Sequence, residues 1–169
     1  MNDTNETYLF HQTPKHLAKD LIPFVPLVEG DKVLEPFKGE GAFYDVIPNF
    51  CVKSWAEIRQ GRDYTDASDD QDWVITNPPF RLEGNTGRIN AFWFLIDYYT
   101  QRVRKGIAFL ANDSCFCTLT PKRMKILQER GFSITKVVIC SVKKWRGRYF
   151  FFILQKQNSN LVSYLPNNY

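Results

Sequence analysis

The sequence has little of what a metal centre, a disulfide framework or a membrane span would need. Its 169 residues include only four cysteines and two histidines. None of the cysteines, Cys51, Cys115, Cys117 and Cys140, belongs to the Cys-x-x-Cys pairs typical of zinc sites. Nor is there an uninterrupted run of about eighteen apolar residues, the minimum for a transmembrane helix. We therefore expect reduced thiols, no metal and no membrane association.

The chain also lacks room for a second folded unit of ordinary size. We expect a single domain over residues 1–169, with a core of about 12–156 and no separate target-recognition domain. The segment MNDTNETYLF is polar and acidic, unlike a secretory signal or a transit peptide, so we expect the cytoplasm or the nucleus. The formal net charge of +4 mildly favours a polyanionic partner.

Short β-rich runs alternate with helical patterns along the chain. This alternation predicts an α/β fold with a mostly parallel sheet and helices on its faces. A helix opened by Thr13-Pro14 should end early because of Pro23 and Pro26. The short connection between the last two strands predicts an antiparallel pair. We expect strands at 32–35, 51–57, 73–76, 106–111, 134–140 and 149–155, helices at 89–103 and 121–130, a helix starting at 42–47, and a polar loop at 81–87.

Several unusual segments follow directly on predicted strands. In an open α/β sheet ligands bind beyond the carboxyl ends of the strands, so these segments should meet in one crevice. Gly39 and Gly41 would let a nucleotide-type cofactor approach the backbone closely. Glu57 has the spacing of a carboxylate that grips the two hydroxyls of a ribose. The segments are EPFKGEG at 35–41, Glu57, GRDY at 61–64 and NPPF at 77–80.

Asn77-Pro78-Pro79-Phe80 is the most specific of these segments. The paired prolines restrict the backbone, so a carbonyl and the Asn77 side-chain oxygen can be held side by side. Two such acceptors can take both N–H bonds of a planar amino group, which favours a pyramidal nitrogen and aims its lone pair at an electrophile. Phe80 would stack on the ring that carries the amino group.

Taken in order, these segments resemble the successive motifs of class I S-adenosylmethionine-dependent amino-methyltransferases, especially the adenine-N6 type. The resemblance covers roughly residues 12–155. It implies a seven-stranded Rossmann-like sheet with an antiparallel last strand, S-adenosylmethionine as cofactor, and methyl transfer to adenine N6 in DNA or RNA. Lys38 and Glu40 depart from the small residues that the family often carries in the glycine turn.

The resemblance also implies roles for individual residues. Asn77, the Pro78 carbonyl and Phe80 would hold the target base. Glu57 would bind the cofactor ribose, and Asp63 would accept a hydrogen bond from the cofactor adenine. The methionine end of the cofactor would be lined by Thr13, Glu35, Gly39 and Gly41.

Basic residues cluster at 102–105, 122–125 and 143–148. In the last cluster aromatic residues interleave with the charges, which suits phosphate contacts combined with base stacking. We expect nucleic acid to contact Lys144, Trp145, Arg146 and Arg148. Because no segment is long enough for a target-recognition domain, a protein partner or a second copy in a homodimer would supply recognition, or little sequence is read.

Two other functions remain open from the sequence. A protein glutamine methyltransferase would also hold a planar NH2 group with an Asn-Pro-Pro-aromatic motif. A non-catalytic methyltransferase-like subunit of a complex is the second alternative, although it would have no chemical need for intact cofactor and Asn77 motifs.

Overall fold

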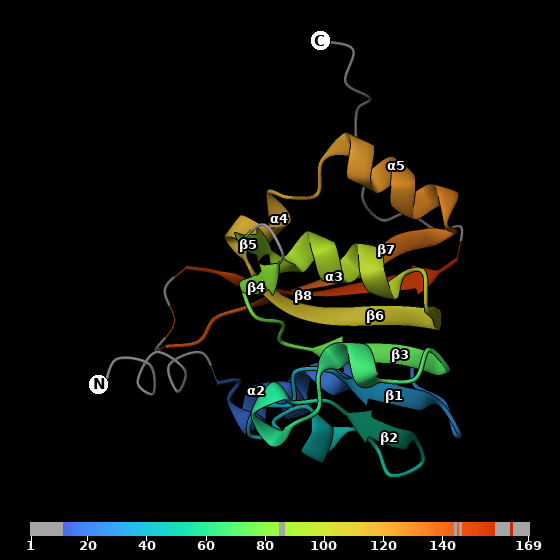
Figure 1. Ribbon diagram of the computed structural model, residues 1–169, viewed down its shortest axis with the longest axis vertical. Coiled ribbons are helices and arrows are strands. Elements are labelled where there is room, and N and C mark those ends of the chain that lie inside the picture. Colours follow the sequence, from blue (N-terminus) through green and yellow to red (C-terminus); the bar gives the residue numbers. More distant parts are fainter. Residues whose placement is uncertain (1–11, 85–86, 144, 146, 158–162, 164–169) are drawn as a thin grey trace.

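The computed structural model describes residues 12–84, 87–143, 145, 147–157 and 163 (Figure 1). The main sheet has the strand order β2-β1-β3-β6-β8-β7. Strands β2, β1, β3 and β6 run parallel, and β8 runs antiparallel to both of its neighbours. The α/β class and the antiparallel closing pair are therefore confirmed. The strands are β1 (Lys32–Glu35), β2 (Val52–Trp55), β3 (Gln71–Thr76), β6 (Val103–Asn112), β7 (Phe132–Cys140) and β8 (Tyr149–Lys156).

The main sheet has six strands in the described part of the chain, not the expected seven. Strand β2 forms one edge, and only residues 56–70 connect it to β3. A crossover between parallel strands needs about a dozen residues or more. The connection is therefore long enough for one crossover and too short to hold a further strand with a crossover of its own.

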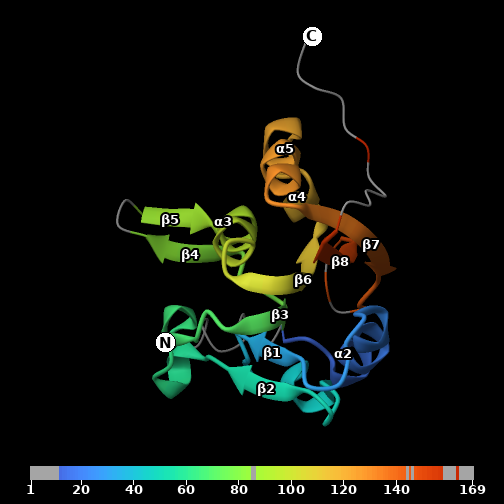
Figure 2. The same ribbon diagram turned by 90° about the vertical axis from the view of Figure 1, so that its right-hand side faces the viewer.

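Helices cover both faces of this sheet. Figure 2 shows α2 and α3 on opposite sides of it. On one face α2 and the following 3-10 turn pack over a core that includes Val33, Ile75 and Ala108; on the other, α3 and α5 pack over Leu34 and Val74. The helices are α2 (Lys15–Leu21), α3 (Ala91–Tyr99), α4 (Asp113–Phe116) and α5 (Pro121–Glu129), and the 3-10 turns are η1 (Ile22–Phe24), η2 (Tyr44–Val46), η3 (Ile58–Gln60) and η4 (Tyr64–Asp66).

The helix expected at 89–103 is shorter, because α3 spans only Ala91–Tyr99, strand residues precede it and β6 begins at Val103. Two further segments differ in kind from what the sequence predicts. The expected polar loop at 81–87 belongs to a hairpin of β4 (Arg81–Gly84) and β5 (Gly87–Asn90). The expected start of a helix at 42–47 contains only the short turn η2. Pro48 explains the second difference, because a residue before proline is disfavoured in the helical region, and Ile47 has an extended ψ of 130°.

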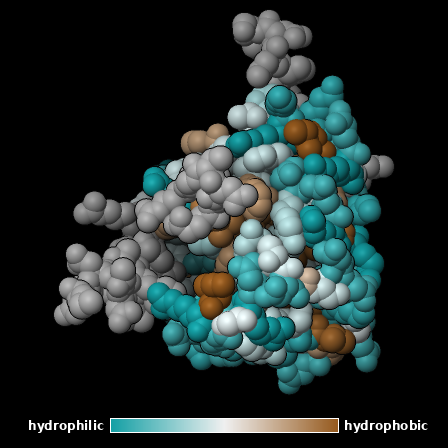
Figure 3. Space-filling model, viewed as in Figure 1, coloured by the Kyte–Doolittle hydropathy of each residue, from teal (hydrophilic) through white to brown (hydrophobic). Residues whose placement is uncertain are grey.

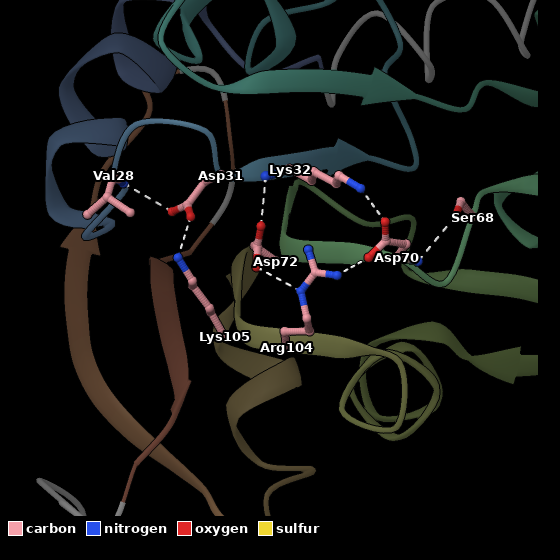
Figure 4. Close-up of polar contacts among 8 residues, drawn as sticks. All are labelled: Val28, Asp31, Lys32, Ser68, Asp70, Asp72, Arg104 and Lys105. Atoms are coloured by element: carbon pink, nitrogen blue, oxygen red, sulfur yellow. Dashed lines mark hydrogen bonds and ion pairs between the residues drawn. The ribbon is translucent and has the colours of Figure 1, made fainter.

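Buried acids and basic side chains join the amino ends of the central strands (Figure 4). Asp31, just before β1, is 2% exposed and forms an ion pair with Lys105 on β6. Asp72 on β3 accepts hydrogen bonds from the Lys32 backbone at 2.9 Å and from the Arg104 guanidinium at 3.0 Å. These contacts join β1, β3 and β6 at their amino ends. The predicted site lies at the opposite, carboxyl ends of the strands.

No helix in the described part of the chain is long and apolar enough to cross a membrane. The face of the molecule in Figure 3 is mainly hydrophilic, and its hydrophobic residues appear as separate spots.

Candidate functional site

A cleft of about 850 Å³ opens at the carboxyl ends of the parallel strands. Its volume lies in the range of small-molecule and cofactor sites. The strand order places the ends of β2, β1 and β3 next to one another along this edge. The cleft is lined by nine of the residues singled out in the sequence: Thr13, Glu35, Gly39, Glu57, Asp63, Asn77, Pro78, Phe80 and Trp145.

The glycine turn and Glu57 are joined by hydrogen bonds. The backbone N–H of Gly39 donates to Glu57 Oε2 at 2.7 Å, and that of Arg59 donates to Oε1 at 3.1 Å. Gly39 has a φ of +51°, a left-handed conformation that glycine adopts at little cost. Each Glu57 oxygen has a second lone pair beyond these bonds, so the carboxylate is fixed in place and retains acceptor capacity.

Glu35 ends β1 at the floor of the cleft and is 2% exposed. Its Oε2 accepts a hydrogen bond from the Tyr44 backbone N–H at 2.6 Å. Burial raises the pKa of Glu35 from 4.5 to about 9, and the Tyr44 hydrogen bond only partly offsets that effect. At neutral pH the Glu35 carboxyl group is therefore protonated.

Asn77 follows β3 and is held by a residue distant in the sequence. Its Nδ2 donates to the Thr13 hydroxyl at 3.1 Å, which orients the nitrogen end of the amide toward Thr13. Thr13 was expected to help open a helix, but α2 begins after Pro14 and receives no side-chain cap. The hydroxyl instead positions Asn77 in the cleft.

Asp63 lines the cleft and also caps the turn η4. Its Oδ1 accepts hydrogen bonds from the Thr65 backbone N–H at 2.9 Å and from the Thr65 hydroxyl at 2.6 Å. Both bonds involve the same carboxylate oxygen. The cap therefore fixes the side chain at the cleft wall.

Of the four residues expected to contact nucleic acid, the structure describes Trp145 and Arg148, and these two have different surroundings. Trp145 is only 7% exposed and packs on Tyr149, with ring centroids 4.4 Å apart, so it forms part of the cleft wall. Arg148 is exposed and does not line the cleft. Lys144 and Arg146 lie outside the described residues.

Gly41 is likewise absent from the cleft lining. It is buried with a φ of +81°, and a Cβ atom there would lie 3.1 Å from the Asp45 carboxylate. The expected contact with the cofactor therefore does not follow from its position. Its glycine identity is explained by the turn itself.

The cleft also contains residues that the sequence analysis did not assign. Phe37 and Tyr64 lie in two of the segments singled out, and their ring centroids are 5.4 Å apart. Arg81 follows the Asn-Pro-Pro-Phe segment directly, and Tyr149 follows the basic cluster. In the sequence, only their position beside the motifs indicated that these residues belong to the site, because none of these residue types by itself identifies a binding site.

Comparison of the structure with solved structures identifies the fold. A protein assigned to the class I S-adenosylmethionine-dependent methyltransferases from Listeria monocytogenes matches with a TM-score of 0.70 at 15% identity, over 95% of this chain and 65% of that one. Magnesium protoporphyrin IX methyltransferase from Synechocystis PCC 6803, with bound S-adenosylmethionine, matches with a TM-score of 0.64 at 10% identity, over 92% and 93%.

A protein assigned as an RNA methyltransferase from Pyrococcus horikoshii matches with a TM-score of 0.58 at 17% identity, over 87% of both chains. This chain thus spans less than two thirds of the Listeria protein and most of the other two. Neither a protein-family model nor a curated protein sequence matches it. At these identities the likeness establishes a Rossmann-like methyltransferase fold.

Proposed function

We propose that this chain is an S-adenosylmethionine-dependent N-methyltransferase that methylates the N6 amino group of adenine in DNA or RNA. The observation that carries the proposal is the meeting of Glu57 and Asn77 in one cleft. The first is suited to a ribose, and the second to a planar amino group. The methyltransferase fold supports the methyl-transfer part of the proposal and does not bear on the adenine-N6 target.

The residues present fit the cofactor. Its ribose needs a fixed acceptor for two hydroxyls, and the Glu57 carboxylate is held by two backbone N–H groups. Its adenine ring needs apolar walls and a polar partner at the rim. Phe37, Ile58 and Tyr64 provide such walls, and Asp63 provides the partner. Glu35 lies at the floor beside the glycine turn, where the methionine end would be held.

Bound S-adenosylmethionine supplies an electrophilic methyl group. The protein's part is to position the acceptor. The Asn77 oxygen and the Pro78 carbonyl accept the two amino hydrogens, and Phe80, which is 36% exposed, offers a ring face to the base. The Thr13 hydroxyl keeps the Asn77 amide in the required orientation. These contacts become stronger as the amino nitrogen gains positive charge, so they favour the transition state.

A flat heteroaromatic acceptor is favoured over a glutamine side chain by the lining of the cleft. Phe80 is 36% exposed and suited to stacking on a base, and the largely buried Trp145 and Tyr149 add aromatic wall to the same cleft. An aliphatic amide would gain less from such walls. The RNA methyltransferase assignment of one structural neighbour is in keeping with a nucleic-acid acceptor.

The acceptor class is tested by incubating the protein with radiolabelled S-adenosylmethionine and separate pools of DNA, RNA and protein. We expect the label in nucleic acid, and N6-methyladenine after digestion. Label in protein glutamine would establish the alternative enzyme. Cofactor binding without any transfer would support a non-catalytic subunit.

The role of Asn77 is tested by Asn77→Ala. We expect unchanged cofactor affinity by calorimetry and a loss of about a hundredfold or more in turnover under saturating conditions, because one transition-state contact is removed. Thr13→Val should reduce turnover in the same direction, whereas Thr13→Ser keeps the hydroxyl and serves as its control. Near-parental turnover of Asn77→Ala would contradict the mechanism.

A further inference from the structure

Arg81 is a cation placed at the cleft immediately after Phe80, and neither the fold nor the methyl-transfer chemistry uses it. Both Arg81 and Leu82 line the cleft at the start of β4. The Arg81 side chain is exposed. Within the described part of the chain it makes no ion pair.

The base of the hairpin holds this position firmly. The Phe80 carbonyl accepts a hydrogen bond from the Ala91 backbone at 3.2 Å, and Arg81 pairs with Asn90 across the hairpin. Asn90 caps α3 by accepting from the Phe92 backbone at 3.2 Å. Arg81 is thus fixed between the end of the Asn-Pro-Pro-Phe segment and the start of a core helix.

Packing sets the direction of the strand as well. Leu82 is half-buried and packs against the core under α3. Neighbouring side chains of a strand point to opposite faces, so Arg81 points away from that core contact. Its guanidinium is therefore presented to solvent at the rim of the cleft.

Two other arginines at the surface of the described chain are already engaged by neighbouring side chains. Arg102 pairs with Asp69 and stacks on Tyr98, and Arg130 pairs with Asp97. Arg81 lies at a cleft rim without an acidic partner among the described residues and follows an aromatic residue suited to a base, which matches the chemistry of a nucleotide. Guanidinium binds phosphate oxygens through two parallel hydrogen bonds.

We propose that Arg81 binds the phosphodiester adjoining the target base. This inference rests on the proposed function. It adds that one residue, Arg81, recognises a backbone phosphate next to the methylated nucleotide. A glutamine acceptor has no such group. Contacts to phosphates position a nucleic acid without reading its sequence.

The test uses short single-stranded oligonucleotides with one adenine, in which either neighbouring phosphodiester is replaced by an uncharged methylphosphonate. Binding is measured by fluorescence anisotropy in the presence of S-adenosylhomocysteine. For the parent protein we expect one methylphosphonate to weaken binding about tenfold, as for the loss of a charge-assisted hydrogen-bonded contact. For Arg81→Gln the modified and unmodified strands should bind equally, to within about twofold. For Arg81→Lys we expect a difference in affinity between the two strands that is intermediate, because lysine keeps the positive charge but cannot form two parallel hydrogen bonds to the phosphate.

Lys125→Gln is the matched control, since Lys125 is an exposed cation on α5 outside the cleft. It should keep the full tenfold difference, and cofactor affinity should be the same in all variants. Two results would overturn the inference while the proposed function stands: parent protein that binds both strands equally yet methylates adenine, or Arg81→Gln that keeps the parental difference. If the parent transfers no methyl group to nucleic acid, the proposed function fails and the inference falls with it.

Discussion

Glu35 and Glu57 are two acids of one cleft with different surroundings. Glu57 accepts two backbone N–H groups, whereas Glu35 accepts one and lies at the buried end of β1. Desolvation disfavours the charged form of a carboxyl group, which explains why the pKa of Glu35 is raised to about 9. A protonated Glu35 can also donate a hydrogen bond, a capacity that an ionised carboxylate lacks.

The raised pKa of Glu35 predicts a pH dependence of stability. Between pH 4.5, its ordinary pKa, and about 9, the folded protein keeps a proton that the unfolded chain has released. The folded state therefore binds more protons, and the free energy of unfolding falls as pH rises through this window. Glu35→Gln should remove this contribution. Its denaturant midpoint should decline less between pH 5.5 and pH 8 than that of the parent.

Glu40→Gln is the control for this measurement, because Glu40 is an exposed acid in the same turn. It should keep the parental pH profile. Parallel profiles for the parent and Glu35→Gln would show that Glu35 is ionised in the folded protein.

The central strands are close enough in one place to require glycine. Gly106 of β6 pairs with Trp73 of β3 on one side and with Gln155 of β8 on the other. A Cβ atom at Gly106 would lie 2.5 Å from the Leu154 carbonyl oxygen and 2.5 Å from the Trp73 ring. One of these contacts is with backbone, so it cannot be relieved by a side-chain rotation.

We therefore expect Gly106→Ala to destabilise the protein by about 2 kcal/mol or more through overpacking, which corresponds to a fall in Tm of roughly 4 to 8 °C. Gly30→Ala provides the comparison. A Cβ at Gly30 has open space around it but a φ of +83°, so its cost is backbone strain of about 1 kcal/mol. Equal effects of the two substitutions in thermal unfolding would contradict the packing explanation.

At the scale of elements, the sequence predicted strands better than short or irregular segments. The buried run of β3 and the proline-started helix α5 carry strong local signals. The β4–β5 hairpin does not, because its strands are polar and short. The sequence of residues 84–87, GNTG, suits either a loop or a turn. Pro48, by contrast, was a readable signal against a helix at 42–47.

Across the whole molecule, the ion pairs of the buried acids Asp31 and Asp72 and the cleft lie at opposite ends of the parallel strands. The ion pairs of Asp31 and Asp72 lie at the amino ends of the strands (Figure 4). The cleft lies at the carboxyl ends. Asp31 also accepts a hydrogen bond from the Val28 backbone at 3.0 Å. Loss of this side chain should therefore affect folding without changing the cleft.

Asp31→Ala tests this separation. It removes two contacts of a buried carboxylate, so we expect a loss of about 2 kcal/mol in unfolding free energy and unchanged cofactor affinity in the folded protein. Asp69→Ala is the control, because Asp69 is 72% exposed and its pair with Arg102 should contribute less than about 1 kcal/mol. Calorimetric titration below the melting transition measures the affinity. Weakened cofactor binding by Asp31→Ala would show that the two edges are coupled.

By itself the sequence determined the α/β class, most strand positions and the segments that follow the strands. These features depend on proline, glycine and apolar alternation, which act over a few neighbouring residues. That the segments belong to one site followed from a general rule of parallel sheets. The individual roles of the site residues remain predictions.

Only the tertiary structure decided how those residues are held. The bond between Asn77 and Thr13 joins positions 64 residues apart, and the protonation of Glu35 depends on burial by several elements. Trp145 belongs to the cleft wall because it packs on Tyr149, although its sequence neighbours are basic. Distant contacts and burial are products of packing across the whole domain, so no local pattern in the chain encodes them.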